Sequence, residues 1–210
     1  MTKLSRLFLA ALLLAALSAR GQTPGDALFR SIGDGDLPEF SRLVSLGVHV
    51  FATNKLGETP LYVAAEKGNL DMVKLLVASR ADARVRTPNG ETVLHAASMI
   101  DEAALMTALI EAGAEVEGAN RDGETALFWA AMTGTFLAVK ALADAGADLN
   151  VRDRNGNTPL HAAARHDDVV LVHYLLSKNV RTDIRNERGQ TPLEMAKVAG
   201  HRSAASLLER

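Results

Sequence analysis

The chain has 210 residues, and its 23 basic and 25 acidic side chains give a formal net charge of −2 at pH 7. A balance this close to neutral argues against nucleic acid as a bulk partner. The sequence contains no cysteine, which excludes disulfide bonds, thiolate metal sites and a cysteine nucleophile. Hydrophobic residues make up 48% of the chain but aromatic residues only 4%, so the core must consist mainly of aliphatic side chains.

The first 21 residues are predicted to be a secretory signal peptide. Lys3 and Arg6 form a basic N-terminal segment, all residues from 7 to 17 are apolar, and small residues follow. The apolar run is too short for the ~20 residues that span a bilayer. Arg20 stands where a bacterial lipoprotein would need a cysteine. We therefore expect a periplasmic or secreted protein without stable membrane insertion after cleavage; a short uncleaved anchor or a buried N-terminal helix is the alternative.

The rest of the chain repeats with a fixed period of 33 residues. Gly57, Gly90, Gly123, Gly156 and Gly189 stand one period apart, with no insertion or deletion between them. A strict period of this length is typical of a stacked array in which each unit contacts its neighbours.

Each period predicts a short helix followed by a second helix. Thr158 is suited to cap the first helix, and Pro159 fits the first helical position, where a missing N–H costs nothing. Leu70, Val73 and Leu76 recur on one face of a second helix. Asn-Gly or Asp-Gly pairs at the period boundaries predict tight turns that project as fingers.

Left-handed residues are predicted to end the second helices. Gly113 and Gly146 suit this conformation. Asn179 tolerates it, whereas Arg80 at the same position should cost ~1–2 kcal/mol.

The motif Gly-Asn-Thr-Pro-Leu-His-Ala-Ala-Ala at 156–164 and the Gly-Ala-Asp turn at 146–148 resemble the ankyrin repeat family. The resemblance covers roughly residues 25–210. It implies an all-α repeat solenoid, an ankyrin-type stack of helix-turn-helix units with short β-hairpin fingers. It also implies a binding scaffold, whose partner the fold itself does not specify.

Six repeats are expected, of which the first and last are caps. Residues 22–53 form a degenerate N-terminal repeat in which Asp26 is predicted to cap the first helix. Residues 186–210 form the C-terminal cap, because Lys197 and Arg202 replace residues that elsewhere pack against a following repeat. The four full repeats are predicted at 54–86, 87–119, 120–152 and 153–185.

The histidines are interpreted as structural. His95 and His161 fill the motif position of the resembled family, and each is predicted to hydrogen-bond its own turn and to tie adjacent repeats. A metal site formed by His161, His166 and His173 is the alternative. Their spacings of five and seven residues do not place three rings on one helix face, so we predict no metal.

No enzyme chemistry is predicted. The acidic pairs at 167–168 and 115–117 fall in predicted turns, where solvation is expected. Every glycine is explained by the repeat frame or the N-terminal turn, which leaves no phosphate-binding loop, and no serine lies in a nucleophile elbow. We therefore expect neither a cofactor nor a catalytic residue.

The resemblance implies that the fingers and first helices line a concave face that binds partners. The residues expected there are Leu56, Glu66, Lys67, Met99, Ile100, Arg121, Trp129, Met132, Thr133, Arg154, Arg165, His166 and Arg188.

Two features of this expected face stand out. Its centre is apolar, with Met99, Ile100, Trp129 and Met132. One end is rich in arginines: Arg121, Arg152, Arg154, Arg165, Arg185 and Arg188. Tryptophan and arginine often anchor protein interfaces, and methionine adapts to varied surfaces. The alternatives are that Trp129 fills space between repeats and that the arginines are ordinary solvated charges.

The function predicted from these patterns is that of an exported, monomeric scaffold or adaptor that binds an envelope or extracellular protein. The expected epitope is acidic and partly apolar, although a phosphate, an anionic glycan or a lipid headgroup would also suit the arginines. A secreted effector, or an immunity or inhibitor protein acting on a foreign target, is the alternative. A hydrolase or metal enzyme is disfavoured.

Overall fold

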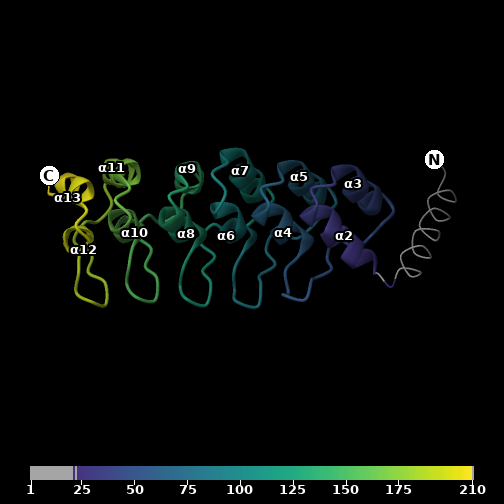
Figure 1. The fold of residues 1–210 in the computed structure, drawn as a ribbon, viewed down its shortest axis with the longest axis horizontal. Coiled ribbons are helices and arrows are strands. Elements are labelled where there is room, and N and C mark those ends of the chain that lie inside the picture. Colours follow the sequence, from purple (N-terminus) through teal and green to yellow (C-terminus); the bar gives the residue numbers. More distant parts are fainter. Residues whose placement is uncertain (1–20, 22, 210) are drawn as a thin grey trace.

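The computed structural model describes residue 21 and residues 23–209, so the predicted signal peptide lies outside the described residues apart from Gly21. The described part contains twelve helices in two rows (Figure 1). The inner row, next to the fingers, comprises α2 (Pro24–Gly33), α4 (Pro60–Glu66), α6 (Val93–Ser98), α8 (Ala126–Thr133), α10 (Pro159–Arg165) and α12 (Pro192–Ala199). The outer row comprises α3 (Leu37–Ser45), α5 (Leu70–Ala78), α7 (Ala103–Glu111), α9 (Phe136–Asp144), α11 (Val169–Ser177) and α13 (Arg202–Leu208).

The inner helices begin as their sequences predict. Thr59 and Thr158 are N-caps whose hydroxyls accept hydrogen bonds from backbone amides of the first turn, at 3.2 and 3.4 Å. Proline occupies the first position of both helices, where no amide partner is lost. Alanines such as Ala64 and Ala163 are fully buried, which lets neighbouring inner helices pack closely.

The first helix is capped by a different residue from the predicted one. Thr23, and not Asp26, is the N-cap of α2, and its hydroxyl accepts from the Asp26 amide at 3.1 Å. The Asp26 carboxylate accepts in return from the Thr23 amide at 3.0 Å, which completes a capping box. This amide contact holds the pKa of Asp26 below its ordinary value.

The core runs between the two rows of helices. Each outer helix of the full repeats buries three side chains, such as Met72, Val73 and Leu76 of α5. Val73 and Leu76 face the core as predicted, whereas Leu70 at the start of the helix is only half-buried.

The helix ends adopt the predicted left-handed conformation. Gly113 and Gly146 have φ of 90°, and Arg80 and Asn179 have φ of 64° and 55°. Arg80 therefore sits in a region that costs a residue with a Cβ atom ~1–2 kcal/mol.

The fingers are tight loops with one isolated β-bridge, Ala119–Thr125, and no strand within the described residues. Neighbouring fingers are joined by backbone hydrogen bonds in which Arg121, Arg154 and Glu187 donate to the preceding finger, each at 2.9 Å. The corresponding residue one repeat earlier is Pro88, which has no N–H to donate.

The last described repeat, α12 and α13, carries exposed charges at positions where the preceding repeats place mostly apolar residues. Lys197 and Arg202 are both exposed, whereas Ala164, one period before Lys197, is fully buried. Lys197 forms a 2.7 Å ion pair with Glu209. Across residues 21 and 23–209, none of the helices has the length and apolar character needed to cross a bilayer.

Candidate protein-binding face

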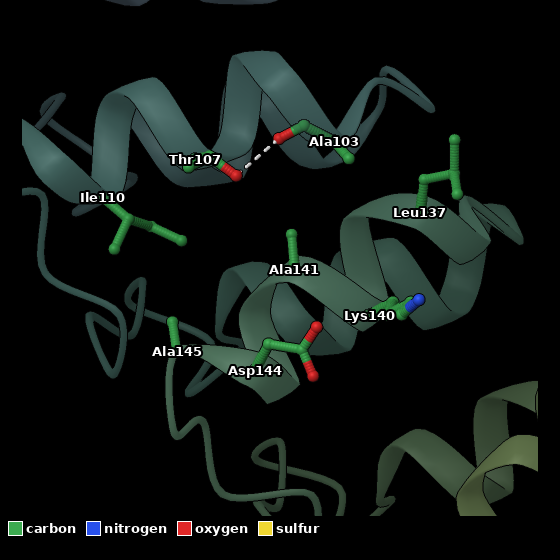
Figure 2. A pocket seen from close by; sticks show the side chains of 8 residues that line it. All are labelled: Ala103, Thr107, Ile110, Leu137, Lys140, Ala141, Asp144 and Ala145. Atoms are coloured by element: carbon green, nitrogen blue, oxygen red, sulfur yellow. Dashed lines mark hydrogen bonds between the residues drawn. The ribbon is translucent and has the colours of Figure 1, made fainter.

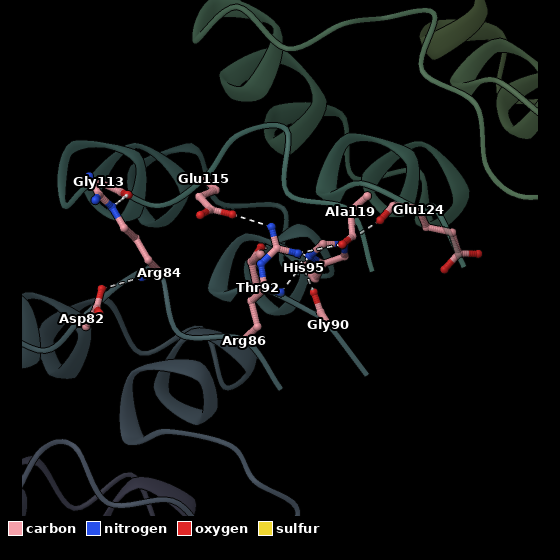
Figure 3. A network of polar contacts seen from close by, with 10 residues as sticks. All are labelled: Asp82, Arg84, Arg86, Gly90, Thr92, His95, Gly113, Glu115, Ala119 and Glu124. Atoms are coloured by element: carbon pink, nitrogen blue, oxygen red, sulfur yellow. Dashed lines mark hydrogen bonds and ion pairs between the residues drawn. The ribbon is translucent and has the colours of Figure 1, made fainter. Parts of the chain in front are cut away.

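Two buried histidines join successive repeats. The Nδ1 atom of His95 accepts the Thr92 amide at 3.0 Å, so its proton is placed on Nε2, which donates to the Glu124 carbonyl of the next repeat at 2.9 Å (Figure 3). His161 repeats the arrangement with the Gln190 carbonyl at 3.0 Å. Burial lowers the pKa of both rings. The predicted structural role of these histidines is confirmed.

The same position in the other full repeats is occupied by Tyr62 and Phe128. The Tyr62 hydroxyl donates to the Glu91 carboxylate of the next repeat at 3.2 Å. Burial, assisted by the Glu91 charge, raises the pKa of Tyr62. Phe128 is 3% exposed and provides an apolar contact instead.

Three arginines one or two periods apart hold the fingers in place. Arg86 donates to the Ala119 carbonyl of the next repeat at 2.7 Å and pairs with Glu115 (Figure 3). Arg152 donates to the Arg185 carbonyl at 3.0 Å. Arg185 in turn pairs with Glu194 at 2.7 Å. The guanidinium groups of Arg152 and Arg185, both predicted at the arginine-rich end, are thus engaged within the array.

The acidic turn residues are exposed or half-buried, and they also accept hydrogen bonds or form ion pairs. Asp167 accepts the Ala204 amide at the start of α13 at 2.9 Å, and Asp168 caps its own helix α11. Glu117 accepts the Asp148 amide of the next repeat at 2.7 Å. These carboxylates thus satisfy backbone donors. In the described part of the chain, no group of three or more His, Asp or Glu side chains is placed to hold a metal.

The predicted residues that remain available form a row along the ends of the inner helices. Glu66, Met99, Met132 and Arg165 stand one period apart, and Val198 continues the row on the cap. All five are exposed; Met99 is 53% and Met132 44% exposed. Sequence reasoning missed Val198, although its spacing from Arg165 marks it as a member of the row.

Trp129 packs between two repeats, which is one of the two roles predicted for it. Its indole N–H donates to the Glu124 carboxylate at 2.7 Å, and its ring meets His95 edge-on with centroids 5.1 Å apart. The ring is half-buried. Trp129 therefore contacts His95 of the preceding repeat and remains partly exposed.

Two other residues predicted on the face, Ile100 and Thr133, make contacts within the array. The half-buried Ile100 lies against Gly68 of the preceding repeat, so closely that an added Cβ atom there would be 3.3 Å from it. The Thr133 hydroxyl donates to the Trp129 carbonyl at 2.9 Å. The exposed apolar surface at the centre consequently belongs mainly to Met99 and Met132.

The charged residues predicted on this face differ in how far they are engaged. Arg154 pairs with Asp122 and donates to the Arg121 carbonyl at 3.0 Å. Lys67 lies 3.8 Å from the carboxylate of its neighbour Glu66. The Arg121 side chain is exposed, as are Leu56, at 69%, and His166.

The structure brings Arg165 and Arg188 together. Both line a polar pocket of about 210 Å³ between the last two repeats. The other lining residues are Asn155, Asn157, Asn186, Glu187 and Met195. Sequence reasoning missed the asparagines and Met195, because their convergence depends on the stacking of neighbouring fingers.

Two further hollows lie elsewhere. A groove of about 390 Å³ runs between outer helices α7 and α9, lined by residues such as Thr107, Leu137 and Lys140 (Figure 2). It contains none of the predicted site residues. A hollow of about 500 Å³ between α2 and the first finger includes Leu56 and Phe29.

Comparisons with known proteins agree with this architecture. A family model of ankyrin repeats in three copies matches residues 75–153 and 137–210, and a model of ankyrin repeats in many copies matches residues 43–97. No curated protein matches the chain. A solved structure of the predatory endopeptidase Bd0816 from Bdellovibrio bacteriovorus in complex with the immunity protein Bd3460 contains a similar chain, the immunity protein. The likeness has a TM-score of 0.78 and 32% identity, and covers 87% of this chain and 96% of that one.

Ankyrin repeats serve as protein-binding scaffolds, and members of this family are typically not enzymes. The similar immunity protein is itself bound to another protein. Another protein is thus the class of partner that the comparisons support. By its period, its paired helices and these matches, the chain belongs to the ankyrin repeat family.

Proposed function

We propose that this protein is an immunity protein that binds an endopeptidase of its own organism and suppresses its activity. The observation that carries the proposal is the 32% identity to an immunity protein bound to an endopeptidase, over 96% of that protein's chain. This favours the immunity protein among the functions predicted from the sequence, but with an endopeptidase of the same organism as the target in place of the predicted foreign one. The chain itself is proposed to have no catalytic activity.

The exposed side chains support binding through the finger and inner-helix face. Met99 and Met132 offer adjacent apolar surface, which is adaptable because methionine is flexible and polarizable. Arg165 and Arg188 come later in the sequence than these methionines, and arginine is enriched among the residues that contribute most to the binding energy of protein interfaces. The exposed methionines and arginines of this face are therefore residue types that are common in protein interfaces.

The location is proposed to be outside the cytoplasm. The basic N-terminal segment, the short apolar run and the small residues that follow are typical of a secretory signal. Measurement of the intact mass of protein purified from its source tests this, since export with processing removes about 20 residues and an unprocessed chain retains them.

The function is tested with the source organism's endopeptidase most similar to Bd0816. Wild-type protein should form a complex with it on size-exclusion chromatography and reduce its rate of peptide hydrolysis. A Met132→Glu variant places a carboxylate in the apolar centre and should lose both effects, because a charge buried without a partner is costly. Its matched control is Lys74→Glu on the outer helix α5, an exposed position on the opposite row.

Three results are informative. Binding and inhibition that Met132→Glu abolishes and Lys74→Glu leaves intact support the proposal. Binding without inhibition means an adaptor for the endopeptidase. No complex with the wild-type protein overturns the proposed function.

A further inference from the structure

The pocket between the last two repeats has a rigid polar frame. Asn186 is 7% exposed, and its amide donates to the Asn157 side-chain carbonyl at 2.9 Å. The Asn157 amide donates to the buried Asp153 carboxylate at 3.1 Å. The Asn186 side-chain carbonyl accepts the Arg188 and Gln190 amides, each at 3.0 Å. This hydrogen-bond chain fixes the last two fingers relative to each other and shapes the pocket.

The two guanidinium groups at the pocket are not part of that frame. Arg165 is the last residue of α10, and Arg188 lies in the last finger. Neither side chain forms a hydrogen bond or an ion pair with any residue among 21 and 23–209. This contrasts with Arg152 and Arg185, which donate to carbonyls of neighbouring repeats.

The charge of the pocket favours an anion. Two arginines and Glu187 line it, which leaves one net positive charge. The Asp153 carboxylate behind the pocket is already an acceptor for Asn155 and Asn157. A guanidinium offers several donors in one plane and no acceptor, so its complement is a planar acceptor without donors. A carboxylate has that geometry.

We propose that this pocket binds an aspartate or glutamate side chain of the endopeptidase, held between Arg165 and Arg188; this inference rests on the proposed function. The volume of about 210 Å³ admits one such side chain. Met195 forms an apolar part of the lining, against which the methylene groups of the acidic residue pack. The pocket thereby adds charge specificity to the apolar contact at Met99 and Met132.

The first test compares affinities. The double variant Arg165→Gln with Arg188→Gln removes both charges and leaves shorter, uncharged polar side chains. Its affinity for the endopeptidase should fall by about 30-fold or more, the loss typical when one partner of a buried charge pair is removed. The matched control is Lys74→Gln with Arg202→Gln, which removes two exposed charges on the outer helices. It should bind as the wild type does.

The second test identifies the ligand group directly. An Arg165→Lys variant keeps the charge and introduces an amine that a carbodiimide can couple to a nearby carboxylate. Mass spectrometry of the crosslinked complex should find a peptide joining position 165 to an aspartate or glutamate of the endopeptidase. The same treatment of the Lys74→Gln control, which retains Arg165, should give no crosslink at that position.

The outcomes separate the two proposals. If wild-type protein does not bind the endopeptidase, both fail. If it binds and the arginine double variant binds equally well, the pocket proposal alone is overturned. The same holds if Arg165→Lys forms the complex but crosslinks only through other lysines. Thermal melts of every variant check that the fold is retained.

Discussion

The link that His95 makes between two repeats leads to a quantitative prediction. Its ring joins the Thr92 amide to the Glu124 carbonyl in a fully buried position. Phenylalanine at this position keeps most of the volume, as the natural Phe128 one repeat later shows, but makes neither hydrogen bond. The Thr92 amide would then lack a partner, at a cost of ~1–3 kcal/mol, whereas the Glu124 carbonyl would keep the Asn120 amide at 2.8 Å. His95→Phe should therefore lower the free energy of unfolding by about 1–3 kcal/mol.

Equilibrium urea unfolding, followed by circular dichroism at pH 7.5, measures this loss. His173→Phe on the outer helix α11 is the matched control, because it removes an exposed histidine. The control should change stability by less than ~0.5 kcal/mol. A loss below ~1 kcal/mol for His95→Phe would refute the assigned role of the ring, since even one orphaned group should cost that much.

The pH dependence of the same variants provides an independent check. Because burial lowers the pKa of His95, the folded state keeps the ring neutral while the unfolded chain takes up a proton below its ordinary pKa of about 6.5. The ring's contribution to stability is thus complete above that pH and decreases as the pH falls toward the folded-state pKa. The stability difference between wild type and His95→Phe should consequently be larger at pH 7.5 than at pH 5. An equal difference at both values would contradict a buried neutral ring.

Three further predictions, each measured by urea unfolding, concern one hydrogen bond to a helix start and two left-handed residues. Asp167→Ala removes the side-chain acceptor for the Ala204 amide and should lower the free energy of unfolding by about 1 kcal/mol. Amide hydrogen exchange should become faster only in the last repeat, and a uniform increase along the chain would contradict the assigned cap. Arg80→Gly removes the steric cost of a left-handed residue with a Cβ atom and should raise the free energy of unfolding by up to about 1 kcal/mol. A lower free energy of unfolding would mean that contacts of the arginine side chain outweigh this cost. Gly57→Ala should lower the free energy of unfolding by more than ~1 kcal/mol, because φ at this position is 78° and the new Cβ atom would lie 2.7 Å from the Pro88 ring. An unchanged urea midpoint would mean that the finger changes conformation at no measurable cost.

The repeat frame predicts much of the fold because its signals are local. Thr158 and Pro159 begin α10 as their chemistry requires, and Gly113 ends its repeat in the left-handed conformation. The histidine at position 95 could also be interpreted correctly, since its partners lie in its own turn and at a fixed offset in the next repeat. A fixed period converts a local pattern into an inter-repeat contact.

The candidate face was less predictable, because its residues are distinguished by what their long side chains reach. Arg152 and Arg165 look alike in sequence, yet only Arg152 donates to a carbonyl of the next repeat, 33 residues away. Trp129 is suited to an interface by its residue type, but a carboxylate five residues earlier in the chain fixes its indole. Such differences depend on rotamers and on neighbouring repeats, which the period does not encode.

The repeat pattern does not specify the binding partner, because the residues that define the pattern serve only the stacking of the repeats. The exposed row of Met99, Met132 and Arg165 shows where substitutions cost the fold little. The proposed target class comes instead from the likeness to an immunity protein over nearly its whole length.

Hydrogen–deuterium exchange of the protein with and without the endopeptidase shows whether the finger and inner-helix face is the surface that binds. Slower exchange on binding is expected in the second to fifth fingers, around residues 89, 122, 155 and 188, and at the ends of α8 and α10. The outer helices α5, α7 and α9 should exchange as in the free protein. Protection concentrated on those outer helices, or no protection anywhere at saturating endopeptidase, would contradict the proposal that this face binds an endopeptidase.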